Sequence, residues 1–199
     1  MKTKWAGVLL AAALVAAPAG AQRFRVGGFY KMDTFPDSFD DYYRGTVHGL
    51  GAEFGWEFWG PLSADVAASY GKQELERGAF WPEIHPPEER AQIPVTAALS
   101  VGYAAGPVRF FGTIGGGFLA ERYQFRAVYL EPRDEYYGVA TLGIGGRVRL
   151  PGNFYVASAF RHLFVAGRQL EYWYQSGEYF HYRGHGDLNE LTFGGGIFF

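Results

Sequence analysis

The sequence predicts an all-β fold, an eight-stranded antiparallel up-and-down transmembrane β-barrel. Three observations predict it: apolar residues alternate with small or polar ones, glycine and aromatic residues are abundant, and short connections alternate with long ones. The 199 residues include 29 glycines, 18 phenylalanines, 14 tyrosines and 5 tryptophans. The glycines show no collagen period, so collagen-like chains and ordinary helical domains are disfavoured.

Composition also excludes several functions. With no cysteine, the chain has no disulfide framework, no thiolate nucleophile and no cysteine-bound zinc. Its 18 basic and 20 acidic residues give a formal charge of -2, so we expect no nucleic-acid partner. No cofactor motif is present, and His181 and His185 lack a third convergent ligand. We therefore expect neither a cofactor nor a metal site.

The first 21 residues have the features of a secretory signal peptide. Lys2 and Lys4 precede the apolar run 5–17, and Pro18 and the small residues 19–21 follow it. A membrane-spanning helix needs about 20 apolar residues, and this run is shorter. We therefore expect residues 1–21 to be cleaved and residues 22–199 to form one exported barrel domain.

Eight segments have the period of two that is typical of strands with two unlike faces. One face is apolar and carries no charge, while the opposite face holds glycine and polar residues. The apolar residues are even-numbered in 23–31, 48–58, 62–71, 108–118 and 140–150. They are odd-numbered in 95–103 and 191–199. The less regular segment 154–164 brings the count to eight.

Short and long connections alternate strictly between these segments. The short ones contain Gly60, Gly106 and Gly152, and the long ones cover 32–45, 72–92, 122–136 and 165–186. Strict alternation places the short turns at one end of the sheet and the long loops at the other. Transmembrane β-barrels have this pattern, with short periplasmic turns and longer outer loops.

Alternation alone also fits a soluble lipocalin-type barrel, which would turn its apolar face inward. The uncharged apolar face, the glycine-rich opposite face and aromatic residues near strand ends favour the membrane. We expect two aromatic girdles: Trp56, Phe58, Trp59, Tyr103, Tyr155 and Phe198 on the turn side, and Tyr30, Tyr70, Tyr123, Tyr136 and Tyr137 on the loop side.

The last segment ends on Phe199, with Leu191, Phe193 and Ile197 on the same face. This resembles the C-terminal signal that the outer-membrane assembly machinery recognises. With the export signal and the eight segments, the chain resembles the OmpA, OmpX and opacity-protein group of Gram-negative outer-membrane barrels. The resemblance implies an integral outer-membrane location. The expected partners are outer-membrane lipids, lipopolysaccharide and the barrel assembly machinery.

The inward parity collects nearly balanced charges. An eight-stranded barrel is only wide enough for side chains to fill it, and buried charges need partners. We therefore expect an ion-paired, largely closed lumen, and the alternative is a narrow gated ion channel in which pairs exchange partners. A wide diffusion pore needs about 16 strands. The predicted network is Glu53, Glu57, Asp65, Arg109, Glu121, Arg147, Arg149, Arg161 and Glu190, with Arg23 and Arg25 on the same parity.

A lipid A-modifying barrel enzyme is the less favoured alternative. Ser158 and His162 share a strand face, but extended geometry places them about 13 Å apart. By resemblance, a lipid A deacylase would have serine two residues after the histidine, where this chain has Phe164. We therefore expect no catalytic residues.

Segment 170–183 is unusually aromatic, and its two arms flank Ser176-Gly177, which predicts a protruding β-hairpin. Large aromatic side chains with polar groups suit the binding of a host protein or a glycan. The alternative is an extension of the last two strands into the lipid headgroup zone. We expect a role in adhesion, surface recognition or envelope structure. The candidate binding residues are Tyr172, Trp173, Tyr174, Tyr179, Phe180 and Tyr182.

Overall fold

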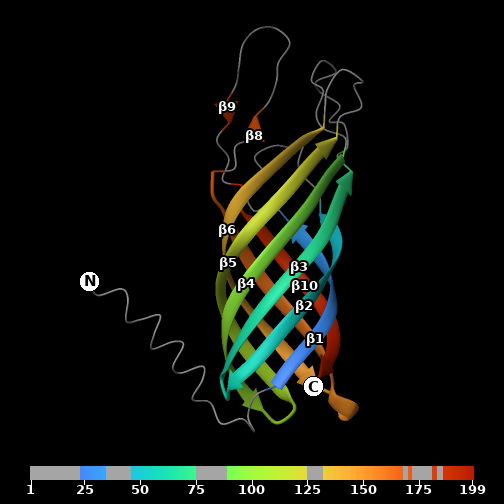
Figure 1. Ribbon diagram of the computed structural model, residues 1–199, viewed down its shortest axis with the longest axis vertical. Helices are drawn as coiled ribbons and strands as arrows, with labels where there is room; N and C mark the ends of the chain where they lie inside the picture. Colours follow the sequence, from blue (N-terminus) through green and yellow to red (C-terminus); the bar gives the residue numbers. More distant parts are fainter. Residues whose placement is uncertain are drawn as a thin grey trace, which may run out of the picture.

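The chain folds into a closed antiparallel β-barrel (Figure 1). The computed structural model describes residues 23–34, 46–74, 89–124, 132–167, 170–171, 181–182 and 186–199. Within these ranges, eight strands close the barrel in the order β1-β10-β7-β6-β5-β4-β3-β2. Strands that follow one another around the barrel pair antiparallel, and β1 pairs with β10 to close it. The predicted fold class is confirmed.

The strands of the barrel differ in length. They are β1 (Arg23–Thr34), β2 (Val47–Trp59), β3 (Leu62–Glu74), β4 (Glu89–Ala105), β5 (Val108–Gln124), β6 (Arg133–Arg149), β7 (Phe154–Val165) and β10 (Leu188–Phe198). Strands β4, β5 and β6 have 17 residues each, whereas β7 has 12 and β10 has 11. Outside the barrel, β8 (Leu170–Glu171) pairs with β9 (His181–Tyr182).

Several strands, among them β1, β3, β4, β5 and β6, reach further toward the loops than the sequence predicts. Strand β1 continues to Thr34 and β4 begins at Glu89, although residues 32–45 and 72–92 were expected to be loops. Asp33 and Arg90 are each 1% exposed in the barrel interior, so their charge does not mark them as loop residues. A strand therefore continues past a charged residue when the side chain of that residue points into the lumen and finds a partner there.

Three short turns lie at the end of the barrel that carries the C-terminus (Figure 1). They join β2 to β3, β4 to β5, and, through the 3₁₀ turn η3 (Pro151–Asn153), β6 to β7. Gly106 and Gly152 have φ angles of 61° and 75°, a left-handed conformation that glycine adopts without steric cost. The predicted short turns are therefore present, and most residues of the long connections lie outside the described ranges.

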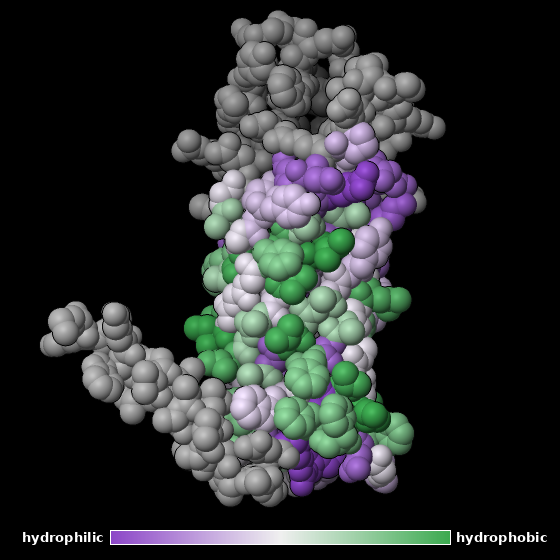
Figure 2. Space-filling model, in the orientation of Figure 1, coloured by the Kyte–Doolittle hydropathy of each residue, from purple (hydrophilic) through white to green (hydrophobic). Residues whose placement is uncertain are grey.

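The apolar parity faces outward, which is the reverse of a lipocalin-type interior. Leu50, Ile114 and Ile144 are 66 to 70% exposed, whereas Ser100 and Thr113 are buried on the opposite face. Figure 2 shows hydrophobic residues across the middle of the visible face and hydrophilic residues toward both ends. Among the described residues, no helix is long and apolar enough to cross a membrane.

The aromatic girdles form only in part. Tyr103 and Tyr136 are about three-quarters exposed, at 74% and 75%, as a girdle requires. Phe58 is instead buried beside Trp56, where the β2–β3 register shifts between Glu57 and Trp59. Four further predicted girdle residues lie on the inward parity: Tyr123, Tyr137, Tyr155 and Phe198.

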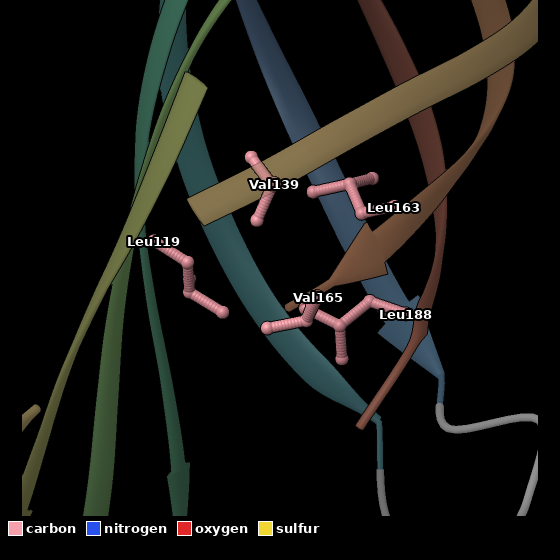
Figure 3. Close-up of a cluster of buried hydrophobic side chains, with 5 residues drawn as sticks. All are labelled: Leu119, Val139, Leu163, Val165 and Leu188. Carbon is pink, nitrogen blue, oxygen red and sulfur yellow. The ribbon is translucent and has the colours of Figure 1, made fainter. Parts of the chain in front are cut away.

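A group of hydrophobic side chains lies inside the barrel, on the face expected to be polar. Leu119, Val139, Leu163, Val165 and Leu188 come from β5, β6, β7 and β10 and point toward one another (Figure 3). None of the five is more than 8% exposed, and Tyr137 packs against them. We call these five residues the apolar cluster.

Candidate functional site

The inward charges of the barrel form three networks at different levels. The turn-end network contains Arg25, Arg109, Arg147, Glu53, Glu57 and Asp65. The mid-lumen network contains Lys31, Arg161, Asp33 and Glu190. The loop-end network contains Arg90, Gln92, Glu121 and Tyr123. The alternation of the strands turns every second side chain into the lumen. The mid-lumen and loop-end networks draw on neighbouring strands, whereas the turn-end network joins β1, β2 and β3 to β5 and β6.

Arg25 is the centre of the turn-end network. Its guanidinium contacts Asp65 and lies 3.7 Å from Glu53 and 3.9 Å from Glu57, and its side chain is 1% exposed. Two hydroxyl groups complete the coordination of the carboxylates. Ser100 donates to Asp65 at 3.0 Å and Tyr155 donates to Glu53 at 2.8 Å. A buried charge with this many partners is held in one position.

Glu57 joins two further arginines to this network. Its Oε1 atom lies 2.9 Å from Nη1 of Arg109 and 2.9 Å from Nη1 of Arg147. Arg109 also donates to the carbonyl oxygen of Pro61 at 2.9 Å. The Arg147 guanidinium lies over the Tyr155 ring at 5.2 Å, within cation–π range. One carboxylate therefore holds two cations at the turn end of the lumen.

The mid-lumen network joins β1, β7 and β10. Nε of Arg161 donates to Glu190 at 2.7 Å, and Nη1 of Arg161 lies 3.5 Å from the Thr96 hydroxyl. Lys31 donates to Asp33 and lies 3.9 Å from Glu190. Lys31, Asp33 and Glu190 are each at most 1% exposed. Two cations and two carboxylates thus balance one another at this level.

In the loop-end network, Glu121 accepts hydrogen bonds from three side chains. Arg90 contacts its Oε1 atom, Gln92 donates to the same atom at 2.8 Å, and Tyr123 donates to Oε2 at 2.7 Å. The Arg90 guanidinium also lies 5.7 Å from the Tyr123 ring. This network involves β4 and β5, two of the three longest strands.

A polar cavity of about 60 Å³ lies between the turn-end and mid-lumen networks. Arg25, Arg147, Arg161, Asp65 and Thr113 are among its lining residues. The cavity is large enough for a few water molecules, but not for a solute that would need a continuous bore. The remaining lining includes alanines and Gly194, whose small side chains create the space.

Comparison with known proteins finds similarity at the level of structure. No protein-family model matches the chain, and no curated sequence does. The outer membrane protein OprG from Pseudomonas aeruginosa is 14% identical with a TM-score of 0.57, and the match covers 90% of this chain and 96% of that one. The attachment invasion locus protein Ail of Yersinia pestis is 11% identical with a TM-score of 0.54, covering 89% and 97%.

Neisserial surface protein A is 8% identical with a TM-score of 0.54, covering 89% of this chain and 96% of that one. The chain has the fold of a small outer-membrane β-barrel. An apolar band around a closed barrel is what a lipid bilayer requires, because no backbone edge is left unpaired in the hydrocarbon. The apolar band and the fold both support the predicted location of the barrel in the bacterial outer membrane.

The structure places eight of the nine predicted lumen residues in the three networks. The ninth, Arg149, is exposed at the turn end and lies 4.7 Å from the Phe198 ring, with no ion pair among the described residues. Lys31, Asp33 and Arg90 were missed. Asp33 and Arg90 could have been predicted as lumen residues by extending the two-residue period of the strands into the ranges 32–45 and 72–92.

His162 lies on the outer wall of the barrel. Its Nδ1 atom is 2.8 Å from Oδ1 of Asn189, and its Nε2 atom is 3.5 Å from Oδ2 of Asp187. Ser158, on the same face, pairs across strands with Phe193. Within the described ranges, no serine or threonine contacts His162, and no three histidine or acidic side chains group as metal ligands. His181 and His185, the histidines considered as metal ligands, lie outside the residues whose side chains are described.

The predicted hairpin is seen only at its base. Leu170 pairs with Tyr182 and Glu171 pairs with His181, antiparallel as expected for two arms of a hairpin. Tyr182 is described through this backbone pairing alone. The other candidate binding residues lie outside the described ranges: Tyr172, Trp173, Tyr174, Tyr179 and Phe180.

The four residues of the predicted assembly signal all face outward, three on β10 and Phe199 directly after it. Leu191 is partly exposed, while Phe193, Ile197 and Phe199 are at least 41% exposed. The Phe199 ring stacks on Phe24 with centroids 6.1 Å apart. Their backbones exchange two hydrogen bonds, of 3.0 and 3.1 Å, at the turn end of the β1–β10 pairing. Phe199 thus contributes to the closed barrel as well as to the predicted signal.

Proposed function

We propose that this outer-membrane barrel has a closed lumen and acts through its outer loops, in adhesion, surface recognition or structural support of the envelope. The pairing of the charges in the turn-end network carries the proposal. Three arginines and three carboxylates there bind one another. Charges that are already paired are poor binding groups for a passing solute, because the solute must displace a partner.

Catalysis is not part of the proposal. The partners of His162 are an amide oxygen and a carboxylate, so a histidine and an acidic residue are present without a nucleophile in contact among the described residues. Nucleophilic catalysis needs the nucleophile and its base within hydrogen-bond reach. A role carried by the loops is therefore favoured over an enzyme in the barrel wall.

Single-channel recording tests the closed lumen. The protein without residues 1–21, refolded and inserted in a planar bilayer, is expected to show no discrete current steps. Steps that change with Glu53→Gln or Arg147→Met would contradict this and support a narrow gated ion channel. That second candidate is favoured by Glu57, because Arg109 and Arg147 share its Oε1 atom and compete for one partner. Protease protection of the barrel confirms insertion in each membrane.

The loops are expected to bind a protein or a neutral glycan more readily than a sulfated glycan. One Ail structure contains the heparin analogue sucrose octasulfate. In this chain, the connection 35–45 contains three aspartates and one arginine, and the connection 75–88 contains three glutamates and one arginine. These acidic loops repel polyanions. Glycan binding that rises with sulfation, or that is unchanged after Tyr172→Ser with Trp173→Ser, would contradict the role assigned to the hairpin.

Phe199→Ala is expected to reduce assembly in cells more than it reduces stability. The substitution removes both the terminal residue of the predicted signal and a ring stacked on Phe24. Phe24→Ala is the matched control, since it removes the same stack and leaves the C-terminus intact. The membrane-inserted fraction in cells and the refolding yield in detergent separate the two effects. Equal assembly of the two variants in cells would argue against recognition of Phe199.

A further inference from the structure

We infer that the apolar cluster, rather than the ion pairs, is the barrier that seals the lumen toward the loops. This inference rests on the proposed closed lumen and names the part of the barrel that closes it. Along β7 the inward residues Arg161, Leu163 and Val165 follow one another toward the loop end. On β5, Leu119 precedes Glu121 in the same direction. The apolar cluster therefore lies between the mid-lumen and loop-end networks.

The cluster is continuous across neighbouring strands. Leu163 is the cross-strand partner of Leu188, and Val165 is the partner of Val139. Leu119 lies opposite Tyr137 on one side and the buried Pro94 on the other. Pairing therefore connects apolar side chains from β4 through β5, β6 and β7 to β10. They form an apolar layer along the β4, β5, β6, β7 and β10 side of the lumen.

Such a layer differs from the charged networks in what it offers to water and ions. At the turn-end network, an ion that displaces one charged partner meets another charged group nearby, because Glu57 lies 2.9 Å from both Arg109 and Arg147. The five side chains of the apolar cluster offer an ion no polar group to replace its hydration, and the cost of transferring an unpaired charge is large. Narrow hydrophobic constrictions block conduction by excluding water. We therefore place the highest barrier to the passage of ions through the lumen at the apolar cluster.

Conductance of substituted barrels tests this placement. Two variants introduce polar groups into the cluster: Leu119→Asn with Leu163→Asn, and the isosteric Val139→Thr with Val165→Thr. Both are expected to produce discrete current steps. The unsubstituted barrel, the apolar control Leu163→Met and the ion-pair variant Glu53→Gln are expected to stay silent. Steps from Glu53→Gln with silence from both polar variants would overturn the inference.

Thiol labelling provides a second measurement that does not depend on current. Because the chain has no cysteine, Ala159→Cys places a single thiol in the lining of the polar cavity. In proteoliposomes with the loops outward, an external thiol reagent is expected to label it about tenfold faster after Val139→Thr with Val165→Thr. An unchanged rate would overturn the inference. A conducting unsubstituted barrel would instead overturn the closed lumen itself, so the two failures are distinct.

Discussion

Glu57→Ala is expected to destabilise the barrel by about 3–5 kcal/mol, the usual result of removing one member of a buried ion pair. Glu57 accepts hydrogen bonds from Arg109 and Arg147, both at 2.9 Å. The side chains of Glu57, Arg109 and Arg147 are only 12%, 13% and 6% exposed. Without Glu57, two cations remain close together with little access to water. The unfolding midpoint in urea, followed by tryptophan fluorescence in lipid vesicles, measures the loss.

Asp134→Ala is the matched control for this experiment. Asp134 and Arg122 lie 3.8 Å apart, and their side chains are 54% and 55% exposed. An exposed ion pair contributes about 0–1 kcal/mol, because water solvates both charges when they separate. Equal shifts of the midpoint for the two variants would show that the turn-end network does not stabilise the barrel through its buried charges.

Gly27→Ala is expected to destabilise the barrel by about 1–3 kcal/mol, the cost typical of overpacking. A Cβ atom on Gly27 would overlap the Tyr155 hydroxyl and lie 2.9 Å from the carbonyl oxygen of Gly195. Tyr155 would then have to leave its hydrogen bond to Glu53. The neighbouring Gly28→Ala is the control, since its Cβ would meet the Gly51 carbonyl oxygen at an ordinary 3.7 Å.

A double-mutant cycle identifies the cause of the Gly27 effect. Tyr155→Ala removes the ring that a Cβ on Gly27 would displace, so Gly27→Ala should cost less in that background. The measured quantity is the difference between the unfolding free energies of the four proteins. If Gly27→Ala costs the same with and without Tyr155, the clash with the Gly195 backbone is the cause, and the packing of Tyr155 is not.

The strand faces were predictable because each face meets a different medium. Lipid outside requires apolar side chains such as Ile114 and Ile144, and a lumen of eight strands requires small or paired ones, so the local alternation carries the information. The partners of each charge were not predictable. Arg147 meets Glu57 from 90 positions away, and this depends on how far each strand is shifted against the next.

The apolar cluster was not predicted. The period of two shows that a strand has two unlike faces, but it does not show where the outward face becomes polar and the inward face becomes apolar. Toward the loops, the outward face carries the exposed side chains of Lys72, Arg122 and Asp134. A wall with polar groups outside can bury Leu119 and Leu163 inside, as a water-soluble protein does. Tyr155 lies inside the barrel for a different reason, because its ring occupies the space that Gly27 and Gly196 leave.

The pairing of β1 with β10 has a mechanical consequence. At its middle, Gly27 faces Gly196 and Gly28 faces Gly195, so the backbones meet there without side chains of their own. The aromatic contact between Phe24 and Phe199 lies at one end of this line. The two strands are also the furthest apart in sequence, which makes their pairing entropically the most costly to form. Under a force that pulls the barrel wall apart, we expect β1 and β10 to separate first. The barrel would then open into a sheet in which the other seven strand pairings remain intact.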